Sequence, residues 1–183
     1  MSTFTYLKNF FKDKNVASIT PTSGFCVRNV TQSISFADTR KVVEYGPGTG
    51  VFTRYLLKQL PEDSEIAVFE TNKEFCEKLE AIADPRLKVF HDGADRATEL
   101  LPDSWNGSTD IVLSGIPFSF LDDEIRNRII TASYSILKEN GQFLAYQTSG
   151  HLKDVLQHYF DALNTDMEWR NIPPMMIYRA LKN

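Results

Sequence analysis

The sequence predicts an α/β fold, a doubly wound and mostly parallel sheet with helices on both faces. Short apolar runs alternate with stretches whose apolar residues recur at helical spacing, which is typical of successive βαβ units. The run formed by Val42, Val43 and Tyr45 is apolar on both faces, as in a buried parallel strand. Two apolar runs at the end of the chain follow each other without a helix, which predicts an antiparallel C-terminal edge.

The first half of the chain alternates strand and helix in short units. Pro61 ends the first helix, and Phe75, Leu79 and Ile82 recur at the spacing of one helical face. The predicted strands are residues 42–45, 65–70 and 87–90, and the predicted helices are residues 51–59, 73–83 and 94–101.

The second half continues the alternation and ends in the strand pair. Asp122 and Asp123 suit the first turn of a helix, where the dipole favours negative charge, and Gly141 ends that helix. Pro173 and Pro174 separate the last two strands. The predicted strands are residues 110–113, 142–147, 166–170 and 175–180, with a further helix at residues 152–160.

Composition indicates one globular unit without a metal. With 183 residues, 42% of them hydrophobic and 24% charged, the chain can bury one sizeable core, and we expect a single domain over residues 1–183. Cys26 and Cys76 have neither disulfide nor zinc spacing, so we expect core thiols in a reducing cytosol. The three histidines also lack metal-ligand spacing.

Charge and hydropathy disfavour two classes of protein. No apolar run reaches the roughly 18 residues of a membrane-spanning helix, and the N-terminus lacks a signal-peptide pattern. A net charge of −4 and a pI near 5.4 disfavour a broad cationic face for nucleic acid. We therefore expect a cytoplasmic protein.

One stretch combines a strand, a glycine-rich turn and a helix. Gly46, Gly48 and Gly50 let the chain bend sharply and let a ligand lie against bare backbone. The third glycine of a dinucleotide fingerprint is replaced by Val51, and no Lys-Ser/Thr pair follows to form a phosphate loop. Glu44 adds a negative charge that repels phosphate and attracts a cation. The pattern favours S-adenosylmethionine, which carries an ammonium and a sulfonium.

The run Glu-x-Gly-Pro-Gly-Thr-Gly resembles the first motif of class I S-adenosylmethionine-dependent methyltransferases. The resemblance implies a Rossmann-like seven-stranded sheet, with S-adenosylmethionine as cofactor and S-adenosylhomocysteine as product. It also implies that the cofactor contacts the strand end and the glycine turn, residues 46–50. The cofactor-binding residues predicted in this stretch are Glu44, Gly46, Pro47, Gly48, Thr49 and Gly50.

Two further acids follow the second and third strands. Glu70 stands where an acid accepts hydrogen bonds from ribose hydroxyls. In the resembled family an acid after the third strand accepts from the adenine amino group, and Asp92 matches that position. The alternatives are a solvated capping acid at Glu70 and a helix cap at Asp92 or Asp95. The cofactor-binding residues predicted here are Glu70, Thr71, Asn72, Asp92, Gly93 and Ala94.

Residues 114–121, the acceptor loop, follow the fourth strand, where class I enzymes meet their substrate. The ribosomal RNA adenine dimethyltransferases, a more distant resemblance, have Asn or Asp there, so that the side-chain amide holds the amine, then Pro-Pro or Leu-Pro and an aromatic residue. Here Ser114 and Gly115 stand in place of the Asn. We assign Ser114 to the cofactor site. The predicted substrate-binding residues are Gly115, Ile116, Pro117, Phe118 and Phe120.

Three ordered segments together resemble the bacterial phospholipid N-methyltransferases, which act on phosphatidylethanolamine. They are residues 20–23 (Thr-Pro-Thr-Ser), 114–117 (Ser-Gly-Ile-Pro) and 170–174 (Arg-Asn-Ile-Pro-Pro), the last followed by Tyr178. The resemblance implies N-methylation of an amine such as a phospholipid headgroup. The alternatives are an enzyme like the ribosomal RNA adenine N6-methyltransferases and a small-molecule or protein methyltransferase.

Residues 4–14 form an amphipathic pattern. Three phenylalanines and Leu7 share one arc of a helix and lysines flank it, a combination that suits an anionic membrane. The alternative is a terminal helix packed on the domain. We expect residues 1–40 to form N-terminal helices that cover the cofactor or dock on the inner face of the membrane, and residues 41–183 to form the catalytic sheet and helices.

Methyl transfer from a sulfonium is an in-line displacement. We therefore expect the enzyme to position the amine, exclude water and remove a proton from the amine. Tyr146 and His151, near the end of the fifth strand, are the candidate bases. Repeated methylation produces a quaternary ammonium, for which Phe118, Phe120 and Tyr146 are candidate cation–π partners.

Overall fold

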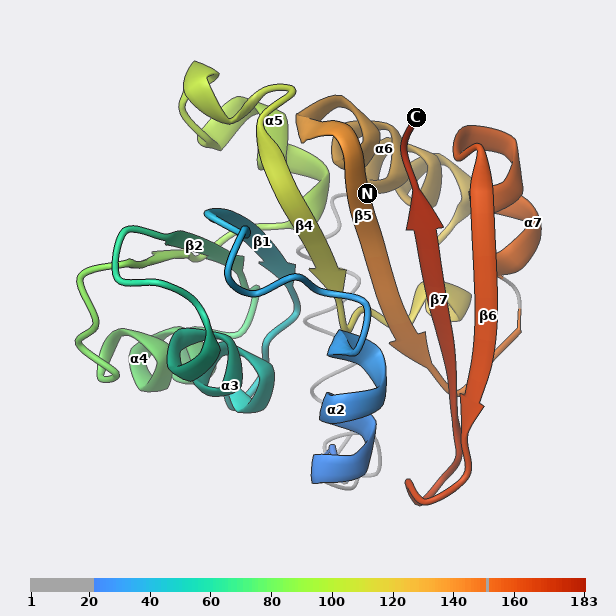
Figure 1. Cartoon of the computed structure of the whole chain (residues 1–183), viewed down its shortest axis with the longest axis horizontal. Coiled ribbons are helices and arrows are strands. Elements are labelled where there is room, and N and C mark those ends of the chain that lie inside the picture. Colours follow the sequence, from blue (N-terminus) through green and yellow to red (C-terminus); the bar gives the residue numbers. More distant parts are fainter. Residues whose placement is uncertain (1–21, 151) are drawn as a thin grey trace.

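The computed structural model describes residues 22–150 and 152–183, which are built around one seven-stranded sheet (Figure 1). The strand order is β3-β2-β1-β4-β5-β7-β6. Strands β1 to β5 pair in parallel, whereas β7 is antiparallel to both β5 and β6. The strands are β1 (Lys41–Tyr45), β2 (Glu65–Phe69), β3 (Leu87–Phe90), β4 (Thr109–Ser114), β5 (Leu137–Gln147), β6 (Ala162–Glu168) and β7 (Met175–Leu181).

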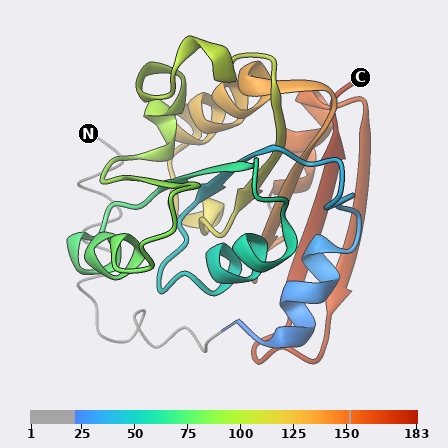
Figure 2. The same ribbon diagram turned by 60° about the vertical axis from the view of Figure 1, so that its left-hand side comes forward.

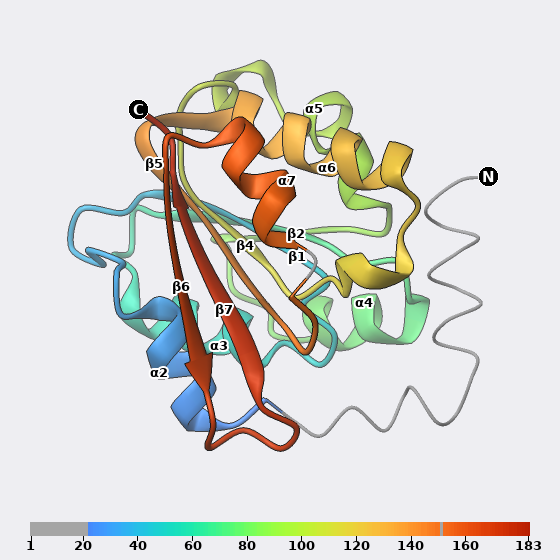
Figure 3. The same cartoon turned by 90° about the vertical axis from the view of Figure 1, so that its right-hand side faces the viewer.

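Helices cover both faces of the sheet. Helices α2, α3 and α4 pack on one face, and α5, α6 and α7 pack on the other (Figure 3). The α-helices are α2 (Gly24–Thr31), α3 (Val51–Gln59), α4 (Lys73–Glu80), α5 (Ala97–Leu100), α6 (Asp123–Ile136) and α7 (Leu152–Tyr159). Short 3₁₀ turns are η1 (Ala94–Arg96), η2 (Asp103–Trp105) and η3 (Phe118–Phe120).

Side-chain caps fix where three of these helices begin. The Ser23 side chain accepts from the backbone N–H of Cys26, and Asp122 accepts from that of Ile125. Asn72 accepts from the first turn of α4 in the same way. Because each cap satisfies a backbone donor that the helix leaves open, it contributes about 0.5–2 kcal/mol and sets the first turn.

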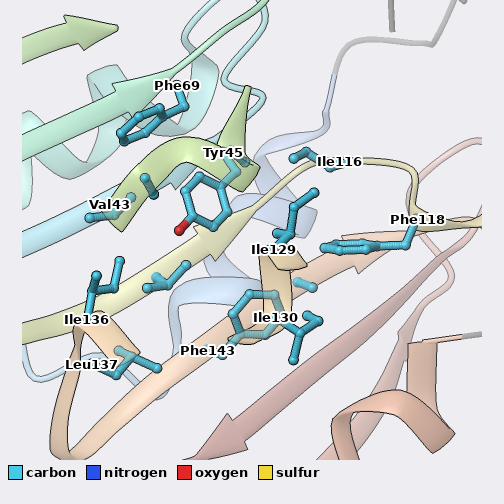
Figure 4. Packing of buried hydrophobic residues seen from close by; sticks show 14 of the residues in the cluster. Val43, Tyr45, Phe69, Ile116, Phe118, Ile129, Ile130, Ile136, Leu137 and Phe143 are labelled. Carbon is cyan, nitrogen blue, oxygen red and sulfur yellow. The ribbon is translucent and has the colours of Figure 1, made fainter. Parts of the chain in front are cut away.

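The first strand is buried on both faces, as its sequence predicts. Val43 and Tyr45 belong to the core under α5, α6 and α7, which Figure 4 shows, whereas Val42 belongs to the core under α2, α3 and α4. Each of these three side chains is fully buried. Burying a side chain of this size contributes about 1.5–3 kcal/mol, so β1 is anchored at the centre of the fold.

The predicted fold class and the antiparallel C-terminal strand are confirmed, but several boundaries differ, among them the start of β6, which lies at Ala162 and not at residue 166. Helix α6 ends at Ile136 and not at Gly141, and β5 begins at Leu137, because Leu137 pairs with Thr109 of β4. Strand β6 ends at Glu168 and does not reach residue 170. The Glu168 carboxylate accepts from the backbone N–H of Arg170 at 2.9 Å, which turns the chain there.

One edge of the sheet carries the carboxyl ends of most strands. Strands β1 to β5 are parallel, so their carboxyl ends share an edge. Strand β6 is antiparallel to β7, which is antiparallel to β5, so β6 also ends at this edge. The turn from β6 to β7 therefore lies at the same edge as the glycine turn. Ligands of open α/β sheets bind at this kind of edge.

Candidate functional site

The glycine turn needs glycine at three positions. Gly46, Gly48 and Gly50 have φ values of 65°, 55° and 81°, which other residues adopt only with strain. A Cβ atom on Gly46 would lie 3.3 Å from Cγ1 of Ile116, and one on Gly50 would lie 2.9 Å from Cδ2 of Leu79. The turn therefore presses bare backbone against the acceptor loop on one side and α4 on the other.

Glu44 is a buried acid directly before the turn. Its side chain is 1% exposed, and it accepts a hydrogen bond of 2.6 Å from the hydroxyl of Thr53. Burial raises the pKa of Glu44 to about 7; the Thr53 hydrogen bond lowers it and the charge of Glu70 raises it. A cation at this position would stabilise the ionised carboxylate.

Glu70 ties β2 to the glycine turn. One carboxylate oxygen accepts from the backbone N–H of Gly48 at 3.0 Å, and the other accepts from that of Asn72 at 2.9 Å. The side chain is 2% exposed, and burial raises its pKa although these hydrogen bonds lower it. Glu70 is therefore not a solvated surface acid. The side chain of Asn72 caps α4.

Asp92 follows β3 and combines a turn contact with an ion pair. It accepts from the backbone N–H of Gly93 at 2.8 Å and from the guanidinium of Arg96 at 2.6 Å. The neighbouring Asp95 instead pairs with Arg128 of α6 at 3.1 Å. Of the two aspartates, only Asp92 lines the pocket described in the next paragraph.

A pocket lies at the carboxyl edge and joins the two predicted sets of residues. Its lining residues are Gly46, Phe69, Glu70, Thr71, Asp92, Ala94, Gly115, Ile116 and Pro117. Five of these come from the predicted cofactor set and three from the predicted substrate set. Phe69 is the one that the sequence analysis missed. Its ring also stacks on Phe90 at a centroid distance of 4.8 Å, so Phe69 both lines the pocket and packs in the core.

The remaining predicted residues lie around this pocket. The hydroxyl of Ser114 is buried and accepts from the backbone N–H of Ile116 at 3.3 Å. The ring of Phe118 lies in the core against Phe143, as Figure 4 shows, whereas Phe120 is 47% exposed. The core ring of Phe118 is therefore not part of the pocket wall.

Tyr146 crosses from β5 to the acceptor loop. Its ring stacks on Phe52 of α3 at a centroid distance of 4.6 Å. A Cβ atom on Gly115 would overlap the Tyr146 hydroxyl oxygen and would lie 2.9 Å from Cζ of the ring. Burial and then the charge of Glu44 raise the pKa of Tyr146, while a hydrogen bond with the Thr22 side chain lowers it. The hydroxyl keeps its proton at neutral pH.

The three segments that resemble phospholipid N-methyltransferases converge. Thr22 of the first segment lies close enough to Tyr146 to lower the pKa of its hydroxyl, and that hydroxyl rests against Gly115 of the second. The backbone N–H of Ser23 in the first segment donates to the side-chain oxygen of Asn171 in the third at 3.0 Å. Segments 148 residues apart along the chain thus meet, and the second of the three segments lines the pocket.

Some predictions fall outside the described residues, namely those on residues 4–14 and on His151. Within residues 22–150 and 152–183, no helix is long and apolar enough to cross a membrane, and no group of three His, Cys, Asp or Glu side chains could hold a metal ion. Both cysteines are free and buried, and burial raises the pKa of Cys26 to about 11 and that of Cys76 to about 12.

Comparison of sequences relates the chain to methyltransferases. The pattern of the family described as "Ribosomal RNA adenine dimethylase" matches residues 3–97, which is more than half of the chain. An ornithine lipid N-methyltransferase of Singulisphaera acidiphila is 26% identical over 179 residues, which span 96% of this chain and 93% of that protein.

Two solved structures share the fold at low sequence identity. Magnesium protoporphyrin IX methyltransferase from Synechocystis, solved with bound S-adenosylmethionine, superposes with a TM-score of 0.71 at 10% identity, covering 100% of this chain and 98% of that chain. Precorrin-6y C5,15-methyltransferase from Geobacter metallireducens superposes with a TM-score of 0.70 at 16% identity, covering 93% and 96%. At these identities the likeness concerns the fold.

Proposed function

The chain belongs to the ribosomal RNA adenine dimethylase family and is a class I S-adenosylmethionine-dependent methyltransferase, and from this premise we propose that it N-methylates an amine of a membrane lipid. The main observation behind the proposal is that Gly115 has no side chain and that the hydroxyl of Tyr146 occupies the space where one would stand. The similarity to a lipid N-methyltransferase along almost the whole chain supports it.

The glycine turn and the buried acids fit S-adenosylmethionine. When bound, this cofactor supplies an electrophilic methyl group on a sulfonium. The absence of a side chain at Gly46 leaves bare backbone at the pocket. Glu44 would ionise more readily beside a cationic ligand, which favours binding. Glu70 and Asp92 would accept hydrogen bonds from ribose hydroxyls and from the adenine amino group.

The acceptor loop argues against the adenine clamp of RNA-methylating relatives. In those relatives an amide side chain holds the amine of a planar base. At Gly115 such a side chain has no room, because the Tyr146 hydroxyl occupies the space that even a Cβ atom would need. A single phenolic oxygen remains to meet the acceptor, which suits an aliphatic amine. Beside the loop, Tyr146 of β5 thus offers a hydroxyl where the relatives offer an amide.

Tyr146 fits a positioning role better than proton removal. Its raised pKa keeps the phenol protonated at neutral pH, so a phenolate base is disfavoured. The oxygen still has lone pairs that accept a hydrogen bond from the amine. In our proposal Tyr146 fixes the amine beside the pocket, and neighbouring apolar side chains such as Phe52 exclude water. His151 stays a candidate base.

Adenine N6-methylation of RNA is the second candidate, because the matched family is described by that activity. The matched stretch, residues 3–97, contains the glycine turn and both pocket acids but stops before the acceptor loop. The similarity to the ornithine lipid enzyme continues through that loop. The half of the chain that would select the acceptor therefore favours a lipid.

The direct test supplies radiolabelled S-adenosylmethionine to the full-length protein with three acceptors in separate reactions. They are ornithine lipid in detergent micelles, phosphatidylethanolamine in the same detergent, and ribosomal RNA. We expect label in a lipid amine. Label in RNA alone would overturn the lipid proposal and favour the second candidate, and label in none of the three would refute both.

Two variants separate cofactor binding from acceptor positioning. Glu70→Gln should weaken S-adenosylmethionine binding in calorimetry, because a neutral amide loses the charge-assisted hydrogen bonds. Tyr146→Phe should leave that binding unchanged while lowering turnover of the lipid about tenfold or more. Full turnover by Tyr146→Phe would remove Tyr146 from the proposed site without affecting the cofactor assignment.

A further inference from the structure

Exposed apolar side chains gather at the edge that carries the pocket. Among the described residues the large hydrophobic side chains that are exposed are those of Phe25, Phe120, Trp169 and Ile172. Trp169 and Ile172 lie in the turn between β6 and β7, residues 169–174, and are 72% and 76% exposed. Exposed apolar side chains that gather in one place mark sites that contact a protein or a membrane.

The turn is held rigidly against α2. The side chain of Asn171 is buried, accepts from the backbone N–H of Ser23 at 3.0 Å and donates to the carbonyl of Pro173 at 2.9 Å. Arg170 stacks over the ring of Phe25 with its guanidinium carbon 4.5 Å from the centroid. Figures 1 and 2 show α2 beside this end of the C-terminal strands. The exposed side chains are therefore presented by a fixed scaffold.

The charges around this turn suit an anionic surface. Arg28 and Arg170 both stack on Phe25 from exposed positions. The nearest carboxylate, Glu168, is 2% exposed and is bonded to Arg170, which holds its pKa down at about 2. The next one along β6, Asp166, faces Arg179 at 4.0 Å. Cationic groups are thus outermost.

We propose that Phe25, Arg28 and residues 169–174, together called the docking tip, insert into the headgroup region of an anionic membrane. The proposal rests on the proposed function, because it names how the enzyme reaches a lipid acceptor. Tryptophan, isoleucine and prolines exposed on a rigid turn, with arginines beside them, combine apolar burial with attraction to anionic lipid.

Other partners fit the docking tip less well. Six residues of turn are small against the roughly 800 Å² that each partner of a stable protein complex contributes. RNA binding draws its affinity from several phosphate contacts, and one of the two arginines here is already paired with Glu168. A bilayer requires neither a matching surface nor many charges.

The position of the tip gives the contact a consequence for catalysis. The tip follows β6, whose carboxyl end shares an edge with the glycine turn and the acceptor loop. The group formed by Thr22, Tyr146 and Gly115 is connected to the tip through the bond between Ser23 and Asn171. A membrane touching the tip would therefore face the side of the molecule where the lipid amine must enter.

The two tryptophans make the contact directly measurable. Trp105 is 1% exposed and gives a constant background, whereas Trp169 reports on the tip. Full-length protein is titrated with vesicles of phosphatidylcholine containing phosphatidylglycerol, with phosphatidylcholine vesicles alone, and with ribosomal RNA. We expect a blue shift and quenching by brominated lipid only with the anionic vesicles. A response to RNA and none to vesicles would overturn the proposal in favour of a nucleic-acid surface.

Variants identify the residues responsible. Trp169→Ser combined with Ile172→Ser should weaken partition into anionic vesicles about tenfold or more, measured by sedimentation. Arg28→Glu should also weaken it several-fold. The matched control is Lys58→Glu, which makes the same charge change on the exposed last turn of α3 and should leave partition unchanged. Unchanged partition of the serine variant would show that another part of the chain, such as residues 4–14, makes the contact, and would refute the tip.

Methyl transfer to lipid in detergent keeps the two proposals apart. The serine variant should lose transfer to lipid in vesicles but keep transfer to the same lipid in micelles. If the unaltered protein methylates micellar lipid without binding vesicles, the docking tip fails and the proposed function stands. If it binds vesicles through the tip but methylates no lipid, the proposed function fails and the membrane contact stands.

Discussion

The contact between Gly115 and Tyr146 gives a sharp prediction for Gly115→Ala. The added Cβ atom would overlap the Tyr146 hydroxyl oxygen, lie 2.9 Å from Cζ and lie 3.1 Å from the carbonyl oxygen of Gly46. The ring cannot simply swing aside, because it stacks on Phe52 at 4.6 Å. The backbone of the glycine turn offers no free space either. The new methyl group is therefore accommodated only by shifting packed atoms.

The cost follows from two opposing effects. Overpacking of this kind destabilises a protein by about 1–3 kcal/mol. Replacing glycine with alanine also restricts the unfolded chain, which stabilises by about 0.4–1 kcal/mol. The net loss in the free energy of unfolding is then about 0–2.6 kcal/mol, with a midpoint of about 1.3 kcal/mol, at which the melting temperature should fall by roughly 3–5 °C for a chain of this length. Thermal unfolding followed by circular dichroism, without added ligand, measures it.

A double-mutant cycle with Tyr146→Phe tests the cause. The phenylalanine ring lacks the oxygen that overlaps the new methyl group but keeps the ring carbon at 2.9 Å, so relief is partial. We expect Gly115→Ala to cost at least about 0.5 kcal/mol less in the Tyr146→Phe background than in the unaltered protein. Equal costs of Gly115→Ala in the two backgrounds would refute the proposed contact.

Three further predictions concern the pocket and the N-terminus. Glu44 has a pKa of about 7 in the folded chain and an ordinary value of 4.5, so the folded chain binds more protons than the unfolded chain between these two pH values. The free energy of unfolding should therefore fall by about 3 kcal/mol as the pH rises through this window. Thermal melts at pH 5 and pH 8 should show this loss in the unaltered protein but not in Glu44→Gln. Gly48→Ala and Gly107→Ala should each lower the free energy of unfolding by about 1–2 kcal/mol, because both glycines have a positive φ and no atom close to the added Cβ. Only Gly48→Ala should also weaken S-adenosylmethionine binding, measured by calorimetry. Equal recovery of unaltered and Phe10→Asp protein with anionic vesicles would count against a membrane role for residues 4–14.

The fold was largely predictable because its signals are local. Hydrophobic periodicity, prolines and glycine-rich turns mark strands and helices within a few residues. The boundary errors arose where a long-range pairing decides the state of the backbone. Asn140 donates to the carbonyl of Lys182 at 2.7 Å, and Leu137 pairs with Thr109, so β5 starts in a stretch that reads locally as the end of a helix. Sequence pattern contains no trace of either partner.

The pocket residues that belong to short sequence motifs were predictable from the sequence. The residues that reach the pocket only through tertiary packing were not. Gly46, Glu70 and Asp92 follow successive strands, and parallel strands bring such positions together. Phe69 is absent from the predicted site because an aromatic residue in a buried strand gives no signal for a ligand. Its position directly before Glu70, at the same strand end, was the one available clue.

Gly115 and Tyr146 behave as one unit, and this explains why the acceptor loop alone is hard to interpret. Considered alone, Gly115 shows only that the amide side chain of the resembled family is absent. Considered alone, Tyr146 is one of several aromatic residues in the chain. Together they place a hydroxyl where a side chain at position 115 would stand, directly behind a residue that lines the pocket. Thr22, which lies close enough to lower the pKa of Tyr146, connects this unit to the first of the three segments. If the proposed function is correct, recognition of the acceptor depends on residues that lie far apart in the chain and meet in one contact.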